Sequence, residues 1–149
     1  MECVTEIDAN ELCVSGDVAT RLLSRYLPIT KLKIDTQFSI KFIELLSLQE
    51  KSPEELEELL VKYLTPEERV NYERSKAPLY FLAKRIAAKI AFMEIYSGEA
   101  KFLYNQIKIE NDEKGCPYFY MKNRIPGYAL SLSDEANMVA VFCCRTSTF

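Results

Sequence analysis

The alanine-rich run Tyr80–Phe92 constrains the fold of this chain more than any other segment. Alanine favours helix and no glycine or proline interrupts the run. We therefore expect one long helix from about Leu79 to Ser97, with Gly98 as its C-terminal stop. The apolar residues of this helix recur every three or four positions and form one face; they are Leu82, Ile86, Ile90 and Met93. The rest of the chain must supply a layer that covers this face.

Two shorter helices are predicted ahead of it by their N-terminal caps. The segments Ser52–Glu55 and Thr65–Glu68 each place a hydroxyl residue before a proline, with glutamate at the third helical position. A serine or threonine cap, proline at the first helical position and glutamate at the third form a capping box. The first of these helices therefore ends near Leu64, and the second begins directly after it.

Strands are predicted on both sides of the helices. The residues from Phe38 to Leu45 alternate between apolar and polar and are expected to form a strand that runs into a loop. Two hairpins follow the long helix, the first around Gly115 and the second around a polar turn at 134–137. Their strands are Gln106–Glu110, Pro117–Met121, Tyr128–Ser133 and Met138–Cys144. The order strand, helices, strands predicts an α+β fold.

The size and composition of the chain fit one domain. Its 149 residues are 48% hydrophobic, enough for one core. We divide the chain into an N-terminal extension, 1–37, and a domain, 38–149. Apolar residues in the extension predict that it packs on the domain; they are Leu22, Leu23, Tyr26 and Leu27. The net charge of −3 argues against a nucleic-acid partner. Without an apolar run long enough for a membrane helix, we expect a cytoplasmic protein that does not bind membranes.

The cysteine and histidine content excludes several kinds of site. The five cysteines are odd in number and two are adjacent, so we expect reduced thiols and not a disulfide framework. They are Cys3, Cys13, Cys116, Cys143 and Cys144. The chain has no histidine, which excludes a Ser-His-Asp triad and histidine-based zinc sites.

Four motifs, in order, resemble those of the 4′-phosphopantetheinyl transferase superfamily, and within it the holo-acyl-carrier-protein synthases. The segment Leu64–Arg69 resembles the family's L-T-x-x-E, 111–118 its hairpin ending in G-K-P, and Ala129–Glu135 its S-(L/I)-S-H. The long helix matches the family's signature helix at Phe81, Leu82, Arg85, Ala87, Ala88, Lys89 and Ala91. This resemblance implies a phosphopantetheinyl-transferase-like fold, with an antiparallel sheet packed on the signature helix.

The resemblance also implies a change in the chemistry. Family members move phosphopantetheine from coenzyme A to a carrier-protein serine, using magnesium held by an aspartate and by a glutamate of the signature helix. Aligned by motif, Lys41 stands at the aspartate and Ile90 at the glutamate. Asp134 stands at the family's histidine, and Cys116 at the lysine of G-K-P. Because a lysine adds positive charge where a dication binds, we expect no magnesium site and loss of the magnesium-dependent transfer.

The sequence leaves an active, divergent transferase open as an alternative. Glu94 lies one helical turn after Ile90 and would rebuild a displaced metal site, unless it forms a salt bridge with Lys41. Other carboxylates near the motifs are Asp112, Asp134 and Glu135. A further alternative takes Glu6-Ile7-Asp8 as the first motif, although no glycine precedes Asp8.

Ligand and partner predictions follow from the matching residues. Arg85 and Lys89 would hold phosphates of coenzyme A, and Ser131 and Ser133 would donate hydrogen bonds to its nucleotide; the alternative is that the two cations pair with acidic residues. The partner implied by the resemblance is an acyl carrier protein or a biosynthetic synthase subunit, and small family members form homotrimers. A binding module, an active transferase and an assembly protein therefore all stay open.

Overall fold

The computed structural model describes residues 38–146; the N-terminal extension, which the sequence predicts to pack on the domain, lies outside this range. The first strand is β1 (Phe38–Glu44). The helices that follow are α3 (Leu45–Gln49), α4 (Pro53–Tyr63), α5 (Pro66–Arg74) and α6 (Pro78–Ile95). The short helix η2 (Tyr104–Gln106) then leads to β2 (Lys108–Asn111), β3 (Pro117–Met121), β4 (Asn123–Arg124), β5 (Tyr128–Glu135) and β6 (Met138–Arg145). Among the described helices, none is long and apolar enough to cross a membrane.

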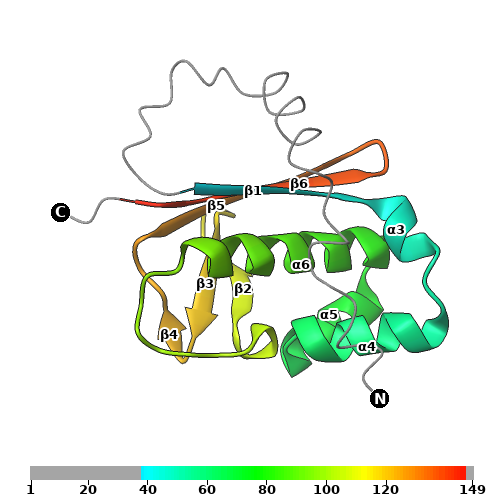
Figure 1. Ribbon diagram of the computed structural model, residues 1–149, viewed down its shortest axis with the longest axis horizontal. Helices are drawn as coiled ribbons and strands as arrows, with labels where there is room; N and C mark the ends of the chain where they lie inside the picture. Colours follow the sequence, from blue (N-terminus) through cyan, green and yellow to red (C-terminus); the bar gives the residue numbers. More distant parts are fainter. Residues whose placement is uncertain (1–37, 147–149) are drawn as a thin grey trace.

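The fold is α+β, as predicted, with an antiparallel sheet packed on the long helix. The strand order in this sheet is β1-β6-β5, and α6 contacts all three strands. A second antiparallel sheet has the order β2-β3-β4. Figure 1 shows α6 running along one side of the first sheet, with α4 and α5 beyond it.

Both predicted capping boxes are present and set the starts of α4 and α5. The Ser52 hydroxyl accepts from the Glu55 amide at 3.1 Å, and the Glu55 carboxylate accepts from the Ser52 amide at 2.9 Å. The same exchange joins Thr65 and Glu68. The first strand differs from the prediction, because β1 runs directly into the helix α3 and not into a loop.

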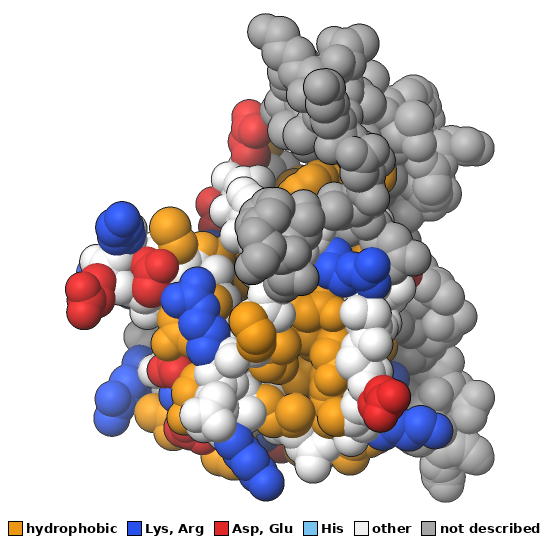
Figure 2. Space-filling view, turned by 90° about the vertical axis from the view of Figure 1, so that its left-hand side faces the viewer, with side chains coloured by type: hydrophobic (Ala, Val, Ile, Leu, Met, Phe, Trp, Pro, Cys, Tyr) orange, Lys and Arg blue, Asp and Glu red, His pale blue; other side chains and the backbone are white. Residues whose placement is uncertain are grey.

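The long helix ends earlier than predicted, and Gly98 is not its stop. It ends at Ile95 because Tyr96 has extended backbone angles. The Tyr96 ring packs against Phe92 and Phe102, with centroids 5.2 and 4.9 Å apart. A Cβ at Gly98 would lie about 2.0 Å from the Tyr96 hydroxyl oxygen, so a larger residue here would require the Tyr96 side chain to shift. Figure 2 views the molecule from this end and shows hydrophobic side chains gathered on it, with charged side chains around them.

The second hairpin has a tighter turn than predicted. Ala136 and Asn137 alone form the turn, both in the left-handed region with φ of 44° and 68°. Two-residue turns of this kind match the twist of the flanking strands. Asp134 therefore lies within β5, paired with Val139, and is not a turn residue.

The register of the sheet decides which side chains face α6. Successive strand residues point to opposite faces. On β1 the residues Ser39, Lys41 and Ile43 point toward α6, because Ile43 belongs to the core cluster and the other two contact Glu94 of α6. The residues of β6 and β5 that pair in this register point to the same face. On β6 they are Val139, Val141 and Cys143, and on β5 they are Leu130, Leu132 and Asp134. The remaining strand residues face the other side of the sheet.

Candidate functional site

An ion pair occupies the position where the sequence resemblance places the metal. Lys41 Nζ lies 2.6 Å from Glu94 Oε2, and the Ser39 hydroxyl donates to Glu94 Oε1 at 2.6 Å. Ile90 lies one turn before Glu94 and is 3% exposed within the core. Both oxygens of Glu94 are therefore engaged, one by an ammonium group and one by a hydroxyl. This is the salt bridge that the sequence left open as the alternative to a displaced metal site.

Two other carboxylates considered as metal ligands are also engaged. Asp134 Oδ2 lies 2.8 Å from Lys84 Nζ across the interface of β5 and α6. Asp112 Oδ1 accepts from the amides of Lys114 and Cys116, both at 2.9 Å, and so holds the turn after β2. Within residues 38–146, no three acidic or cysteine side chains are grouped closely enough to hold a metal ion.

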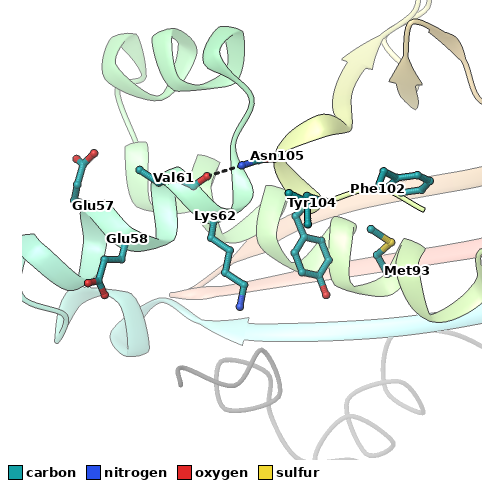
Figure 3. Close-up of a pocket in the computed structure, with 9 residues that line it drawn as sticks. Glu57, Glu58, Val61, Lys62, Met93, Phe102, Tyr104 and Asn105 are labelled. Carbon is teal, nitrogen blue, oxygen red and sulfur yellow. Dashed lines mark hydrogen bonds between the residues drawn. The ribbon is translucent and has the colours of Figure 1, made fainter. Parts of the chain in front are cut away.

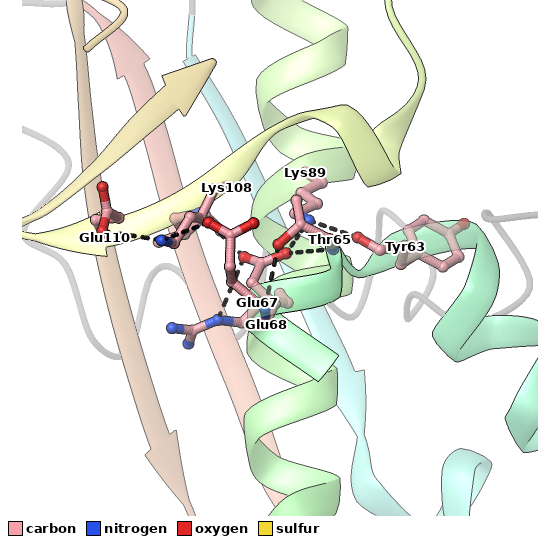
Figure 4. A network of polar contacts seen from close by, with 9 residues as sticks. Tyr63, Thr65, Glu67, Glu68, Lys89, Lys108 and Glu110 are labelled. Atoms are coloured by element: carbon pink, nitrogen blue, oxygen red, sulfur yellow. Dashed lines mark hydrogen bonds and ion pairs between the residues drawn. The ribbon is translucent and has the colours of Figure 1, made fainter. Parts of the chain in front are cut away.

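Lys89 belongs to a buried polar network centred on Glu68 (Figure 4). Its ammonium group donates to Glu68 Oε1 at 2.5 Å and to the Tyr63 carbonyl. Glu68 also accepts from the amides of Thr65 and Ile109, each at 3.0 Å. Lys89 and Glu68 are 0% and 1% exposed. Burial lowers the pKa of Lys89 to about 8, although Glu68 opposes this shift. The network joins α5, α6 and β2.

Arg85 lies at the edge of the same network and is mostly buried. Its Nε lies 3.8 Å from Glu68 Oε2, too far for a hydrogen bond, and has no other hydrogen-bond partner. The guanidinium group stacks on the Phe81 ring, 4.1 Å from the centroid. Burial lowers its pKa, opposed by the charge of Glu68. Glu68 thus lies beside both cations that the sequence assigned to phosphates.

The two serines of β5 lie on the other face of the sheet. Ser131 and Ser133 alternate with Leu130 and Leu132, which pack toward α6. The Ser133 hydroxyl donates to the Ala140 carbonyl at 3.5 Å. The predicted coenzyme A set is therefore divided: Arg85 and Lys89 face Glu68, whereas the serines point away from α6.

The sequence motifs did not reveal three residues that define this region. Glu68 was assigned to a helix cap and to the L-T-x-x-E motif, yet its carboxylate also binds Lys89 and the Ile109 amide. Ser39 and Lys84 were given no role, yet they bind Glu94 and Asp134. The capping box and the L-T-x-x-E motif both include Glu68, but its remaining contacts depend on tertiary packing.

An apolar groove of about 800 Å³ lies between α4 and the segment before β2 (Figure 3). Its floor and rim include Val61, Met93, Phe102, Leu103 and Tyr104. Val61 and Leu103 are 58% and 66% exposed. None of the residues that the sequence singled out for catalysis or coenzyme A binding lines this groove.

The described cysteines are expected to differ strongly in reactivity. Cys116 is exposed, whereas Cys143 is buried on the α6 face of β6. Burial raises the pKa of Cys143 to about 12, so almost no thiolate forms near neutral pH. We expect iodoacetamide to alkylate Cys116 in the native protein and Cys143 only after unfolding, as mapped by mass spectrometry. Alkylation of Cys143 at the rate of Cys116 would contradict the described packing of β6.

Sequence comparison identifies the relatives of the chain. The holo-[acyl-carrier-protein] synthase of Nitrosomonas europaea is 31% identical over 97 residues, which are 58% of this chain and 78% of that protein. The chain belongs to the holo-[acyl-carrier-protein] synthase family. The synthase of Halothermothrix orenii is 40% identical over 84 residues, covering 55% of this chain and 63% of that protein. No protein-family model matches the chain.

Solved structures of holo-[acyl-carrier-protein] synthases share the fold. The synthase from Neisseria meningitidis superimposes with a TM-score of 0.59 at 25% identity, over 74% of this chain and 97% of that one. The synthase from Bacillus anthracis, solved in complex with coenzyme A (3′,5′-ADP), gives a TM-score of 0.58 at 22% identity, over 74% of this chain and 96% of that one. The family and the fold predicted from the sequence are therefore confirmed.

Proposed function

We propose that this chain is a holo-[acyl-carrier-protein] synthase relative that has lost magnesium-dependent phosphopantetheinyl transfer and works as a binding module. The ion pair between Lys41 and Glu94 carries the proposal. Magnesium is bound by hard oxygen ligands, and the residues here do not fit it: the position holds an ammonium group, and its neighbour Ile90 is apolar. The geometry therefore supports no step through a metal ion.

The surrounding charges support a protein partner more than coenzyme A as the ligand. Lys41 and Lys84 are paired with Glu94 and Asp134, and Lys89 is buried on Glu68. A phosphate group would have to compete with these carboxylates for each cation. The proposed partner is an acyl carrier protein or a synthase subunit, because the relatives are named as enzymes that act on the carrier protein.

The second candidate is an active transferase with a rearranged site. It is favoured by the sequence match to holo-[acyl-carrier-protein] synthases and by the coenzyme A complex of a structural relative. This candidate requires Glu94 or Asp134 to leave its lysine and bind the metal. Coenzyme A would then lie beside Arg85, whose side chain is more exposed than that of Lys89, the other predicted phosphate-binding cation.

A transfer assay separates the two candidates. The full chain is incubated with coenzyme A, magnesium and several apo carrier proteins, and the phosphopantetheinyl mass addition is measured. We expect no holo product. Holo product that disappears in Glu94→Ala or Asp134→Ala, but persists in the surface variant Glu73→Ala, would establish the active transferase. Direct binding of a carrier protein without transfer would support the binding module.

A further inference from the structure

The face of the sheet turned away from α6 is apolar on two of its three strands. On this outer face β1 presents Phe38, Ile40 and Phe42, and their partners on β6 are Cys144, Phe142 and Ala140. Phe38 and Phe142 stack with their centroids 5.9 Å apart. On β5 the same face carries the polar residues Ser131 and Ser133. The apolar area is thus a stripe two strands wide.

Among residues 38–146, no helix covers this stripe. Figure 1 shows the described helices together on the opposite side of the sheet. Phe42 is nevertheless only 4% exposed, and it does not belong to the core cluster around α6. An apolar sheet face needs a second layer to bury it. A single helix is about 10 Å across and covers two strands spaced about 4.8 Å apart.

The chain itself carries a segment that matches this requirement. In a helix over 18–27, one half of the surface would be apolar and the other half polar. The apolar half would consist of Val18, Ala19, Leu22, Leu23, Tyr26 and Leu27. The polar half would consist of Thr20, Arg21, Ser24 and Arg25. Such a helix needs an apolar partner surface to be stable.

The connection to β1 is short and ends at the stripe. Residues 28–37 join the segment to Phe38, the first residue of β1. An extended chain spans about 3.3 Å per residue, so this connection can run back along the whole of the 7-residue strand β1. A segment tethered this closely has a high effective concentration at the face.

We propose that residues 18–27 pack as an amphipathic helix across the outer face of β1 and β6. The segment forms the missing layer of the fold, within the same chain. This inference is independent of the proposed function, because it concerns neither the metal position nor the ligand.

Alkylation of Cys144 in the full chain tests this arrangement, since Cys144 lies on the outer face and Cys143 on the α6 face. The variant Leu22→Glu/Leu23→Glu removes the apolar half of the segment, and we expect Cys144 to react about tenfold faster with iodoacetamide. The matched variant Thr20→Glu/Ser24→Glu changes the polar half and should leave the rate unchanged. Cys116 serves as the internal reference, and an unreactive Cys143 shows that the core is folded.

Three results would overturn the proposal. The first is an equal Cys144 rate in the wild type and the Leu22→Glu/Leu23→Glu variant. The second is an equal increase in the Thr20→Glu/Ser24→Glu variant. The third is a wild-type rate that rises on dilution, because protection by a second copy is lost at low concentration and protection within one chain is not. If the double glutamate variant unfolds, Tyr26→Ala gives the same comparison with a smaller perturbation.

Discussion

Replacing Lys89 with methionine is expected to lower the free energy of unfolding by about 3–5 kcal/mol, because it leaves the buried Glu68 carboxylate without its ammonium partner. Glu68 would keep only its two amide donors and the distant Arg85 guanidinium. Methionine is unbranched like the lysine stem and lacks only the terminal ammonium group, so the loss of charge and not a cavity dominates. Urea denaturation of the full chain measures the effect.

Two variants separate the buried charge from general effects of the substitution. Lys108→Met breaks the partly exposed ion pairs with Glu67 and Glu110 and should cost only about 0–1 kcal/mol. Glu68→Gln/Lys89→Met removes both buried charges and should be more stable than Lys89→Met alone. If Lys89→Met is no more destabilising than Lys108→Met, the buried network contributes little to stability.

The variant Lys41→Asp is expected to create a divalent-cation site, whereas we expect none in the wild type. The shorter aspartate would place a second carboxylate opposite Glu94 and leave room between the two, beside the Ser39 hydroxyl. Two facing carboxylates attract a hard cation such as magnesium or manganese. With metal at about tenfold excess over its dissociation constant, we expect the melting temperature to rise by about 3–6 °C.

The matched control is Lys41→Met, which removes the ammonium group without adding a carboxylate. Neither this variant nor the wild type should be stabilised by magnesium or manganese at low millimolar concentration. Equal stabilisation of all three proteins would show that the cation binds elsewhere and that Lys41 does not block a metal position.

Local signals in the sequence predicted α4, α5 and the fold class well, but not the short helix α3. The starts of α4 and α5 were correct because proline and the capping box act within four residues. The tight turn between β5 and β6 was missed, since alanine has no preference for the left-handed angles that Ala136 adopts. The end of α6 was missed because aromatic packing of Tyr96, a tertiary effect, ends the helix.

The motifs located the region of the candidate site but not its pairing. The resemblance correctly indicated that Lys41 and the helix around Ile90 lie together, as the contact with Glu94 shows. It did not reveal that Glu68 lies beside Arg85 and Lys89, because neither the capping box nor the L-T-x-x-E motif specifies which side chains pack against this carboxylate.

Calorimetric titration of coenzyme A into the full chain, with and without magnesium, tests the proposed loss of the metal-dependent site most directly. Because Lys41 stands where the resemblance places the family's aspartate and is paired with Glu94, and because Ile90 is apolar, we expect magnesium to leave the affinity unchanged, whether coenzyme A binds weakly or not at all. An affinity that magnesium raises by about tenfold or more, equal to about 1.4 kcal/mol, would contradict it.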